Sequence, residues 1–333
     1  MKSIVYRGPR EIVVEDRPLP QIGEGEALIR VSHVGVCGTD LNIYQGAHPR
    51  AAAPLIMGHE FAGTIEDGPS SLPKGTPVTV YPLLSCGRCA PCRTGRPHVC
   101  EQLRLIGIDC DGGMAEYVKA PVDKIVSLPP SLALRDGAFV EPLAVGVHAV
   151  RRSGYKPGDR VVVFGAGPIG FCVASCLRYF GASEVIMVEA NPYRLEVARS
   201  LGFTTIDAAG DDIAGKVREH TNGEGADLAF DCAAHPSVQS HILNILRVQG
   251  TAVVVGSYKA PPPVDLLKVE FRELTMIGIR VYEPRDYEIA IKILESGSVD
   301  LEPLLAALEP ETAPGIFDGL VKGSNNIKVL FKM

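Results

Sequence analysis

The stretch VVVFGAGPIGFCVASCL, residues 161–177, decides the fold of the central part of this chain. Its first four residues, 161–164, are apolar without alternation, which is typical of a strand buried on both faces of a parallel sheet. Glycines at 165, 167 and 170 follow at once, and a helical segment follows them. A buried strand, a glycine-rich turn and a helix in this order predict the first unit of a doubly wound α/β domain.

The spacing of these glycines favours a dinucleotide. Gly165 permits the tight turn, Gly167 lets backbone N–H groups approach a pyrophosphate, and Gly170 lets helix and strand pack closely. The helix begins around Pro168 and Ile169, where unsatisfied N–H groups attract an anion. The motif alone is weak evidence, and a purely structural turn is the alternative, but its position between strand and helix supports the cofactor site.

Glu189 indicates which dinucleotide is bound. It lies nineteen residues after Gly170 (189 minus 170), at the end of the apolar run EVIMVE, residues 184–189. A carboxylate there accepts hydrogen bonds from both hydroxyls of the adenosine ribose and repels a 2′-phosphate, so we predict NAD and not NADP. Arg194 argues the other way, because an arginine near this loop can accommodate a phosphate; the alternative is a solvated helix face.

The flanking sequence shows how the chain is organised. Strand-like runs at 184–189, 226–232 and 251–256 alternate with helical segments, which predicts βαβ units and a parallel sheet. Residues 1–128 are short apolar stretches broken by Gly and Pro, as in a small barrel or sandwich. The tail from about 284 is helix-like and then strand-like at 326–332, and composition alone does not assign it to either module.

Composition excludes several classes of protein. With 333 residues, the chain is long enough for about two domains of roughly 150 residues each. Its 46% apolar content suits a globular core, while a net charge of −6 without a basic stripe argues against nucleic acid. No signal peptide and no apolar stretch of membrane-spanning length is visible, so we expect a cytoplasmic protein that does not bind a membrane.

The nine cysteines indicate metal binding and not disulfides, because their number is odd and several are clustered. Four soft thiolate ligands within fifteen positions suit a closed tetrahedral zinc site that stabilises the fold: Cys86, Cys89, Cys92 and Cys100. An iron–sulfur cluster is the chemical competitor, but nothing else in the sequence calls for electron transfer. A nucleic-acid-binding zinc module is disfavoured by the acidic net charge.

Candidate ligands for a second metal lie far apart in the sequence. They are Cys37 in GVCGTD, His59 and Glu60 in MGHEF, and Glu141 in FVEPLAV. A zinc ion with one open position makes a bound alcohol acidic, which is what hydride removal requires. Each residue also has a plain structural explanation as a buried thiol, a core histidine or a surface carboxylate, and spacing alone does not unite them.

Taken in order, the motifs carry a family resemblance. The segments GVCGTDL, GHEFAG, the cysteine cluster, EPLAVGVHA and GAGPIG resemble the zinc-containing medium-chain dehydrogenase/reductase superfamily. The chain looks most similar to its sorbitol, idonate or gulonate, and threonine dehydrogenases. The resemblance implies a GroES-like catalytic domain at 1–145 and 283–333, an NAD-binding Rossmann domain at 146–282, and a homodimer or homotetramer.

The same resemblance implies roles for the site residues. A catalytic zinc ion would be held by Cys37, His59 and one or both of Glu60 and Glu141, and the cysteine cluster would hold a structural zinc ion. A proton would leave through Thr39. Many relatives have a histidine three residues later, where this chain has Asn42, so His48 is a candidate replacement; a solvent-exposed loop histidine is the alternative. Segments that flank the nicotinamide in relatives match Val255, Gly256, Ser257 and Arg280.

The expected reaction is hydride transfer to NAD from a secondary alcohol of a polyol or sugar acid. Tyr44 near the pocket suits a polyhydroxylated substrate, and Arg50 and Arg104 are candidate partners for a sugar-acid carboxylate, although surface arginines are the simpler reading. CGTDLNIY, residues 37–44, also resembles threonine dehydrogenases, so an amino alcohol is the rival substrate. A zinc-independent enone or quinone reductase and a non-catalytic zinc-stapled relative are disfavoured, because all four candidate ligands are present.

Overall fold

The computed structural model describes residues 1–333 and divides into two compact units. The first unit comprises Met1–Glu141, Glu283–Gly297 and Leu304–Met333, and the second comprises Pro142–Tyr282 and Ser298–Pro303. The first boundary falls four residues before the predicted one (145 minus 141), and the short segment 298–303 belongs to the second unit. No helix of the chain combines the length and the apolar content needed to cross a bilayer.

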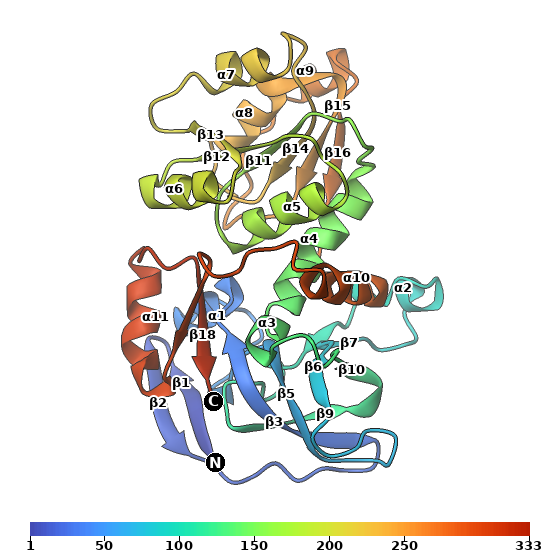
Figure 1. Cartoon of the computed structure of the whole chain (residues 1–333), viewed down its shortest axis with the longest axis vertical. Coiled ribbons are helices and arrows are strands. Elements are labelled where there is room, and N and C mark those ends of the chain that lie inside the picture. The colour runs from blue at the N-terminus through green and yellow to red at the C-terminus, as the bar shows by residue number, and fades with distance from the viewer. The chain divides into compact units, whose positions relative to one another are not determined.

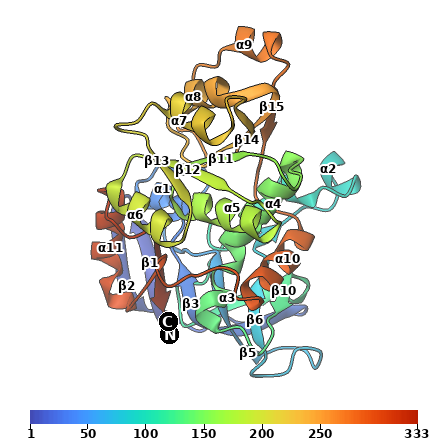
Figure 2. The same cartoon turned by 45° about the horizontal axis from the view of Figure 1, so that its top comes forward.

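The second unit is a doubly wound parallel α/β domain, as predicted. Its six strands have the order β13-β12-β11-β14-β15-β16, which is the order of the dinucleotide-binding fold. Helices α5 and α6 cover one face of this sheet, and α7 and α8 cover the other (Figures 1 and 2). The strands are β11 (Val161–Phe164), β12 (Val185–Glu189), β13 (Thr204–Asp207), β14 (Ala226–Asp231), β15 (Leu246–Val254) and β16 (Thr275–Gly278).

The apolar residues of this unit explain why the sheet is buried. All four residues of β11 are buried, because the strand lies in the middle of the sheet with a helical layer on each side. The helices are α4 (Val140–Ser153), which begins at the unit boundary, α5 (Pro168–Tyr179), α6 (Pro192–Ser200), α7 (Ile213–His220), α8 (Val238–Ile245) and α9 (Leu266–Phe271).

The first unit is β-rich, as predicted. A seven-stranded sheet contains the path β10-β6-β5-β3-β18-β17, with β9 paired to β3, and a second sheet has the order β2-β1-β4. Its strands are β1 (Lys2–Gly8), β2 (Glu11–Asp16), β3 (Glu26–Gly35), β4 (Leu55–Ile56), β5 (Glu60–Asp67), β6 (Pro77–Val80), β7 (Leu83–Leu84), β8 (Arg104–Leu105), β9 (Tyr117–Pro121), β10 (Ile125–Ser127), β17 (Leu305–Leu308) and β18 (Lys328–Lys332).

The pairing of β18 assigns the C-terminal tail. This last strand runs antiparallel to β3, with Leu330 opposite Gly35 and Phe331 opposite Val34, so the tail completes the N-terminal sheet (Figure 1). The helices of the unit are α1 (Gly38–Tyr44), α2 (Ala90–Arg93), α3 (Leu134–Gly137), α10 (Pro284–Glu295) and α11 (Ala313–Val321), with short 3₁₀ turns at Pro97–Val99, Val122–Lys124 and Pro310–Thr312.

Candidate metal centre and dinucleotide site

The predicted metal ligands of the first unit converge at the ends of two neighbouring strands. Cys37 follows β3 and precedes α1, and His59 and Glu60 lie where β5 begins. Because β3 and β5 are paired with Gly35 opposite Glu60, these side chains meet although they are far apart in sequence. The ligand atoms of Cys37, His59 and Glu60 all lie within 4.8 Å of one another.

The electrostatics of this cluster favour a bound cation. Burial by itself would lower the pKa of His59, but Cys37, Asp40 and Glu141 outweigh it and hold that pKa well above its ordinary value. His59 Nδ1 faces Asp40 Oδ1 at 3.9 Å, and neither atom has a hydrogen-bond partner. A thiol, an imidazole and a carboxylate around one buried point are the donors that zinc takes, so the residues fit the metal that the sequence predicted.

Asp40 organises the start of α1. Its Oδ2 accepts a hydrogen bond of 2.8 Å from the backbone N–H of Cys37, and its side chain is fully buried. This contact holds the ligand loop, and the other carboxylate oxygen faces the His59 ring. Carboxylates beside a ligand histidine orient the ring and increase its basicity. Asp40 is therefore a supporting residue of the cluster, and not a group that meets substrate.

Glu141 is buried beside this cluster without joining its closest set. It is the second residue of α4 and is 6% exposed. Its charge acts on His59, on Lys328 and on Tyr287, so it belongs to the same electrostatic environment. Of the two predicted glutamates, only Glu60 lies in the compact group with Cys37 and His59.

Lys328 is a residue of this site that the sequence analysis missed. It forms an ion pair with Glu60 in which both side chains are 2% exposed, and its Nζ donates a 2.9 Å hydrogen bond to the Val36 carbonyl. Burial opposes its charge, but Glu60 and Cys37 outweigh burial and raise its pKa. The only signal in the sequence is a lysine at the start of the apolar run VLF in the strand KVLFK.

The pair packs tightly against Gly35. A Cβ at that position would collide with Glu60 Oε2 and approach Lys328 Cε, so the strand needs a glycine where the ion pair crosses it. The same glycine pairs with Glu60 across the sheet. One oxygen of Glu60 is therefore already paired with the ammonium group of Lys328.

The four clustered cysteines meet in a separate lobe of the first unit. Cys86, Cys89, Cys92 and Cys100 place their sulfur atoms within 4.8 Å of one another. Backbone N–H groups of Arg88 and Cys89 lower the pKa of Cys86 to about 6. The backbone N–H groups of Cys86 and Gln102 both donate to Cys100 Sγ at 3.3 Å. Four convergent sulfurs with N–H support fit a closed zinc site.

In the second unit, the glycine turn has the backbone that its sequence predicts. Gly165 has φ +94°, in the left-handed region that favours glycine, and its N–H donates to the Val188 carbonyl at 2.8 Å. A Cβ at Gly170 would collide with the Gly165 carbonyl oxygen. Helix α5 then begins at Pro168, followed by Ile169. The turn therefore presents backbone N–H groups at the carboxyl edge of the sheet, where a pyrophosphate binds.

Glu189 joins this turn to the next one. Its Oε2 accepts from the Ala166 N–H at 2.8 Å, and its Oε1 accepts from the N–H groups of Ala190 and Asn191 at 2.8 and 2.9 Å. The guanidinium of Arg194 lies beside Gly167, with Nη1 3.8 Å from the place of a Cβ there. Its Nε is buried without a hydrogen-bond partner. Arg194 therefore lies at the glycine turn and is partly buried.

Three other residues predicted for the site have surroundings that are less suited to contact with a substrate or cofactor. Tyr44 is 5% exposed and packs against Phe317 with ring centroids 5.5 Å apart, so its ring is a core group and has little surface for a substrate contact. His48 Nδ1 accepts from the N–H groups of Arg50 and Ala51 at 3.4 and 3.2 Å. Arg280 is exposed after β16.

Thr39 belongs to α1, and the segment predicted to flank the nicotinamide follows β15. Thr39 lies half-buried in the first turn of α1, two residues after Cys37. Val255 and Gly256 directly follow β15, and their N–H groups donate to the Asp231 carbonyl at 3.0 and 2.8 Å. Ser257 is exposed beside them. Arg50 forms an ion pair with Asp109 at 3.1 Å, so its charge is already matched.

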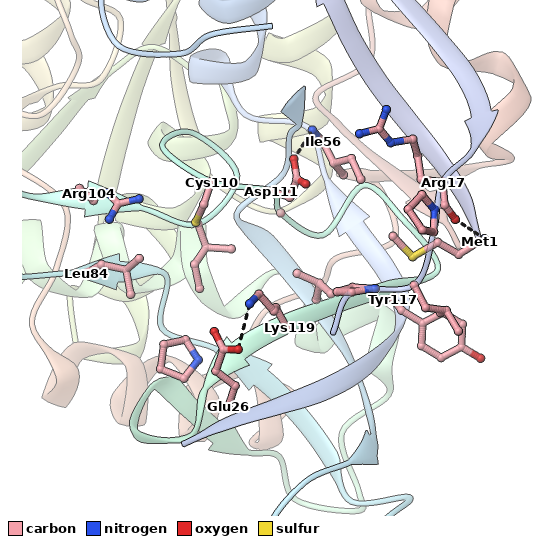
Figure 3. A pocket seen from close by; sticks show the side chains of 17 residues that line it. Met1, Arg17, Glu26, Ile56, Leu84, Arg104, Cys110, Asp111, Tyr117 and Lys119 are labelled. Atoms are coloured by element: carbon pink, nitrogen blue, oxygen red, sulfur yellow. Dashed lines mark hydrogen bonds and ion pairs between the residues drawn. The ribbon is translucent and has the colours of Figure 1, made fainter. Parts of the chain in front are cut away.

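A cavity of about 520 Å³ in the first unit does not include the metal cluster. Figure 3 shows its lining, where Lys119 pairs with Glu26 at 2.9 Å and Asp111 accepts from the Ile56 N–H at 2.9 Å. Arg104, a candidate carboxylate partner, lies here and donates to the Asp109 carbonyl at 3.2 Å. None of the four predicted zinc ligands lines this cavity, so it is distinct from the candidate catalytic site.

Comparison with known proteins identifies the family. Residues 23–130 match the alcohol dehydrogenase GroES-like domain, and residues 168–296 match the zinc-binding dehydrogenase domain. The chain belongs to the zinc-binding dehydrogenases. This confirms the resemblance that the ordered motifs predicted.

Individual relatives align with most of the length of this zinc-binding dehydrogenase. It is 37% identical to the 2-dehydro-3-deoxy-L-galactonate 5-dehydrogenase of Pseudoalteromonas atlantica, over 86% of this chain and 85% of that one. It is 35% identical to the L-threonine 3-dehydrogenase of Bacillus subtilis, over 92% and 90%. Among solved structures, an alcohol dehydrogenase from Escherichia coli CFT073 in complex with NADH superposes with a TM-score of 0.92 at 27% identity, covering 100% and 99% of the chains.

Proposed function

We propose that this protein oxidises a secondary alcohol of a polyol or sugar acid, using a zinc ion and NAD. The observation that carries the proposal is the convergence of the half-buried Cys37 with the buried His59 and Glu60, with ligand atoms within 4.8 Å of one another. A non-catalytic relative would need only the cysteine lobe, and a zinc-free reductase would not need the buried donors. The zinc-binding dehydrogenase match supports the same conclusion.

The catalytic metal would be held by Cys37, His59 and a glutamate. When bound, zinc lowers the pKa of a coordinated alcohol, and NAD accepts the hydride that its carbon releases. We propose that Glu60, which lies in the compact group with Cys37 and His59, and the buried Glu141 beside it supply the carboxylate ligands. Lys328 and Asp40 then act as supporting groups that orient Glu60 and His59.

Thr39 is the proposed first group to take the substrate proton. Its hydroxyl both accepts and donates, and it lies two residues from Cys37. His48 is a poor continuation of the path, because its Nδ1 lone pair already accepts from two backbone N–H groups. Burial also lowers the pKa of His48. With Asn42 in the position of the usual histidine, we propose that the proton passes from Thr39 to water.

NAD is the proposed cofactor because the carboxylate of Glu189 stands at the end of β12, beside the glycine turn. Three backbone N–H groups fix this carboxylate, so it is not free to turn away from a 2′-phosphate. Arg194 lies over the turn and is proposed to contact the pyrophosphate. Solved relatives contain NADH in one case and NADP in another, so the preference for NAD rests on Glu189.

The sugar-acid class is favoured by the galactonate-type relative, and the threonine dehydrogenase supports the amino-alcohol alternative. The deciding experiment follows NADH formation at 340 nm with aldonates, polyols and L-threonine, each with NAD and with NADP. We expect turnover of a polyol or aldonate with NAD and two zinc ions per chain. Turnover of L-threonine alone would replace the substrate assignment, and one zinc ion per chain with no turnover would overturn the catalytic proposal.

A matched pair of variants makes the screen specific. Cys37→Ala removes a proposed zinc ligand, whereas Cys110→Ala removes a half-buried thiol outside both metal groups. We expect the first to lose turnover and one zinc ion, and the second to keep both. Equal activity in the two variants would contradict the assigned metal site.

We also propose that the protein is a homo-oligomer built through the open edge of the second unit. Strand β16 ends the sheet, and the apolar side chains near it are exposed: Val248 at 59%, Leu266 at 69%, Leu267 at 64%, Phe271 at 77% and Met276 at 37%. An unpaired strand edge with apolar neighbours is completed most simply by a second copy. Light scattering after chromatography should show Phe271→Glu shifted towards monomer, with Leu19→Glu, at an exposed leucine of the first unit, unchanged.

The cytoplasm is the proposed location. All nine cysteines are free thiols in the structure. Thiolates that hold metal persist in a reducing compartment, where disulfides are rare.

A further inference from the structure

Asp231 is a fully buried carboxylate at the end of β14 that the proposed chemistry does not use. Its Oδ1 accepts from the N–H groups of Ala233 and Ala234 at 3.2 and 2.9 Å. Its Oδ2 accepts from Gln239 Nε2 at 2.7 Å and from the Tyr258 hydroxyl at 2.5 Å. Four donors use the accepting capacity of a carboxylate almost completely, so the group is held in one orientation.

These hydrogen bonds join segments from three parts of the second unit. Tyr258 lies four residues after the end of β15 (258 minus 254), Gln239 lies on α8, and Ala233 and Ala234 lie in the loop after β14. Gln239 also donates to the Tyr258 oxygen at 3.0 Å, and the Tyr258 hydroxyl is 3.4 Å from the His235 carbonyl. The phenol therefore ties the loop after β15 to the loop after β14.

Close backbone packing extends this connection to the glycine turn. A Cβ at Gly165 would lie 3.1 Å from Ala233, and a Cβ at Gly256 would lie 2.9 Å from the Ala234 side chain. Ala234 itself has φ +49°, an uncommon conformation for a residue with a side chain. The loop after β14 is thus enclosed between the turns that follow β11 and β15, and the Asp231 bonds help to hold its strained backbone.

The sheet order places this network relative to a dinucleotide. In the observed order, β11 and β12 carry the phosphate turn and Glu189, which together take the adenosine half. The second mononucleotide lies over the carboxyl ends on the other side of the switch point between β11 and β14. That side is formed by β14 and β15, whose following loops are the two that Tyr258 connects.

We propose that Tyr258 is a positioning residue for the nicotinamide half of the cofactor, acting through Asp231 on the segment Val255–Gly256–Ser257. This inference rests on the proposed use of NAD. Without the phenolic hydroxyl, the segment keeps its two backbone bonds to the Asp231 carbonyl but loses its side-chain tie to the neighbouring loop.

The phenol of Tyr258 is suited to act as a constant hydrogen-bond donor to Asp231. Burial and the contact with Asp231 raise the pKa of Tyr258 to about 12, so the hydroxyl keeps its proton at neutral pH. Removing a hydrogen bond to a charged group lowers an equilibrium constant that depends on that bond by roughly a factor of ten. The adenosine half is assigned to Glu189 and the glycine turn, whose own hydrogen bonds to Ala166 and to the Val188 carbonyl remain when this hydroxyl is removed.

The test compares Tyr258→Phe with Tyr179→Phe, which removes the same hydroxyl from a 41% exposed ring on α5. Calorimetry measures the dissociation constants of NADH, of ADP-ribose and of AMP for both variants and for the unaltered protein. For Tyr258→Phe we expect NADH binding about tenfold weaker, with ADP-ribose and AMP within about twofold of the unaltered protein. Steady-state kinetics should show a raised KM for NAD with a smaller change in kcat.

The outcomes separate this inference from the proposed function. Failure of the unaltered protein to bind NADH would refute the use of NAD. Normal NADH binding by the unaltered protein and by Tyr258→Phe alike would overturn only the role of Tyr258. An equal loss for NADH and AMP would also overturn it, because a merely structural effect on the fold would weaken both halves together. Melting curves of both variants check that each is folded.

Discussion

The buried pair between Lys328 and Glu60 permits a quantitative prediction. Both side chains are 2% exposed, and the lysine comes from the last strand while the glutamate begins β5. Replacing Lys328 by Met removes the cation but leaves the Glu60 charge in the protein interior. Breaking a buried pair in this way costs about 3–5 kcal/mol, because the remaining charge is neither solvated nor matched.

A double-mutant cycle isolates that cost. We expect Lys328→Met to lower the free energy of unfolding by about 3–5 kcal/mol, and Lys328→Met with Glu60→Gln to recover at least about 2 kcal/mol of the loss. The free energy of unfolding is measured by urea unfolding followed by far-UV circular dichroism, because the chain has no tryptophan to serve as a fluorescent probe. The proteins are compared after chelation and again with zinc, since a released Glu60 would also bind metal more tightly.

An exposed pair provides the control. Lys322, directly after the end of α11, forms an ion pair with Asp318 on that helix, and their side chains are 70% and 40% exposed. The cycle Lys322→Met with Asp318→Asn should give a coupling below about 0.5 kcal/mol, because water screens the pair. Strict additivity of the Lys328 and Glu60 substitutions, at the level of this exposed control, would refute the electrostatic account of the site.

Further predictions concern metal, cofactor and pH. Cys92→Ala should lose the lobe's zinc ion and unfold at a lower temperature, because a closed metal site stabilises its surroundings; zinc content and thermal melting test this, and a fully stable, active variant would contradict it. Glu189→Ala should weaken NAD binding about tenfold and raise the NADP-to-NAD ratio of kcat/KM, since both the ribose acceptor and the tie to Ala166 disappear; an unchanged ratio in steady-state kinetics would argue against the assignment. Burial opposes the charge of Asp227, but Arg160 and Arg247 outweigh burial and lower its pKa from 3.8 to about 2. Because the folded-state pKa is the lower one, the stabilisation of about 2 kcal/mol is complete above pH 4 and is lost as the pH falls towards 2, so urea midpoints of Asp227→Asn and the unaltered protein should differ at pH 7 and converge near pH 2.

Much of the architecture could be predicted from local sequence patterns. The turn at Gly165, Gly167 and Gly170 and the cysteine spacing of 86–100 are short-range features, and the structure contains both as expected. A left-handed glycine or a ligand three residues from the next acts through the chain immediately around it. For the same reason, Glu189 at the end of β12 could be placed from its distance to the turn.

Tertiary structure decided what local patterns leave open. The histidine candidate His48 and the phenol of Tyr44 have suitable chemistry, but two backbone N–H groups occupy the first and Phe317 covers the second. Side-chain chemistry is visible in a sequence, whereas occupancy of a lone pair and burial of a ring depend on neighbours that the fold supplies.

The residue types needed for zinc and dinucleotide chemistry were thus determined by the sequence alone, together with the two kinds of domain that carry them. Which glutamate is engaged by a cation, and that Asp231 links the loops of β14 and β15, emerged only from the folded chain. Lys328 reaches the Val36 carbonyl across 292 residues of sequence. Contacts over such separations depend on strand pairing and burial of the whole sheet, and no short pattern encodes them.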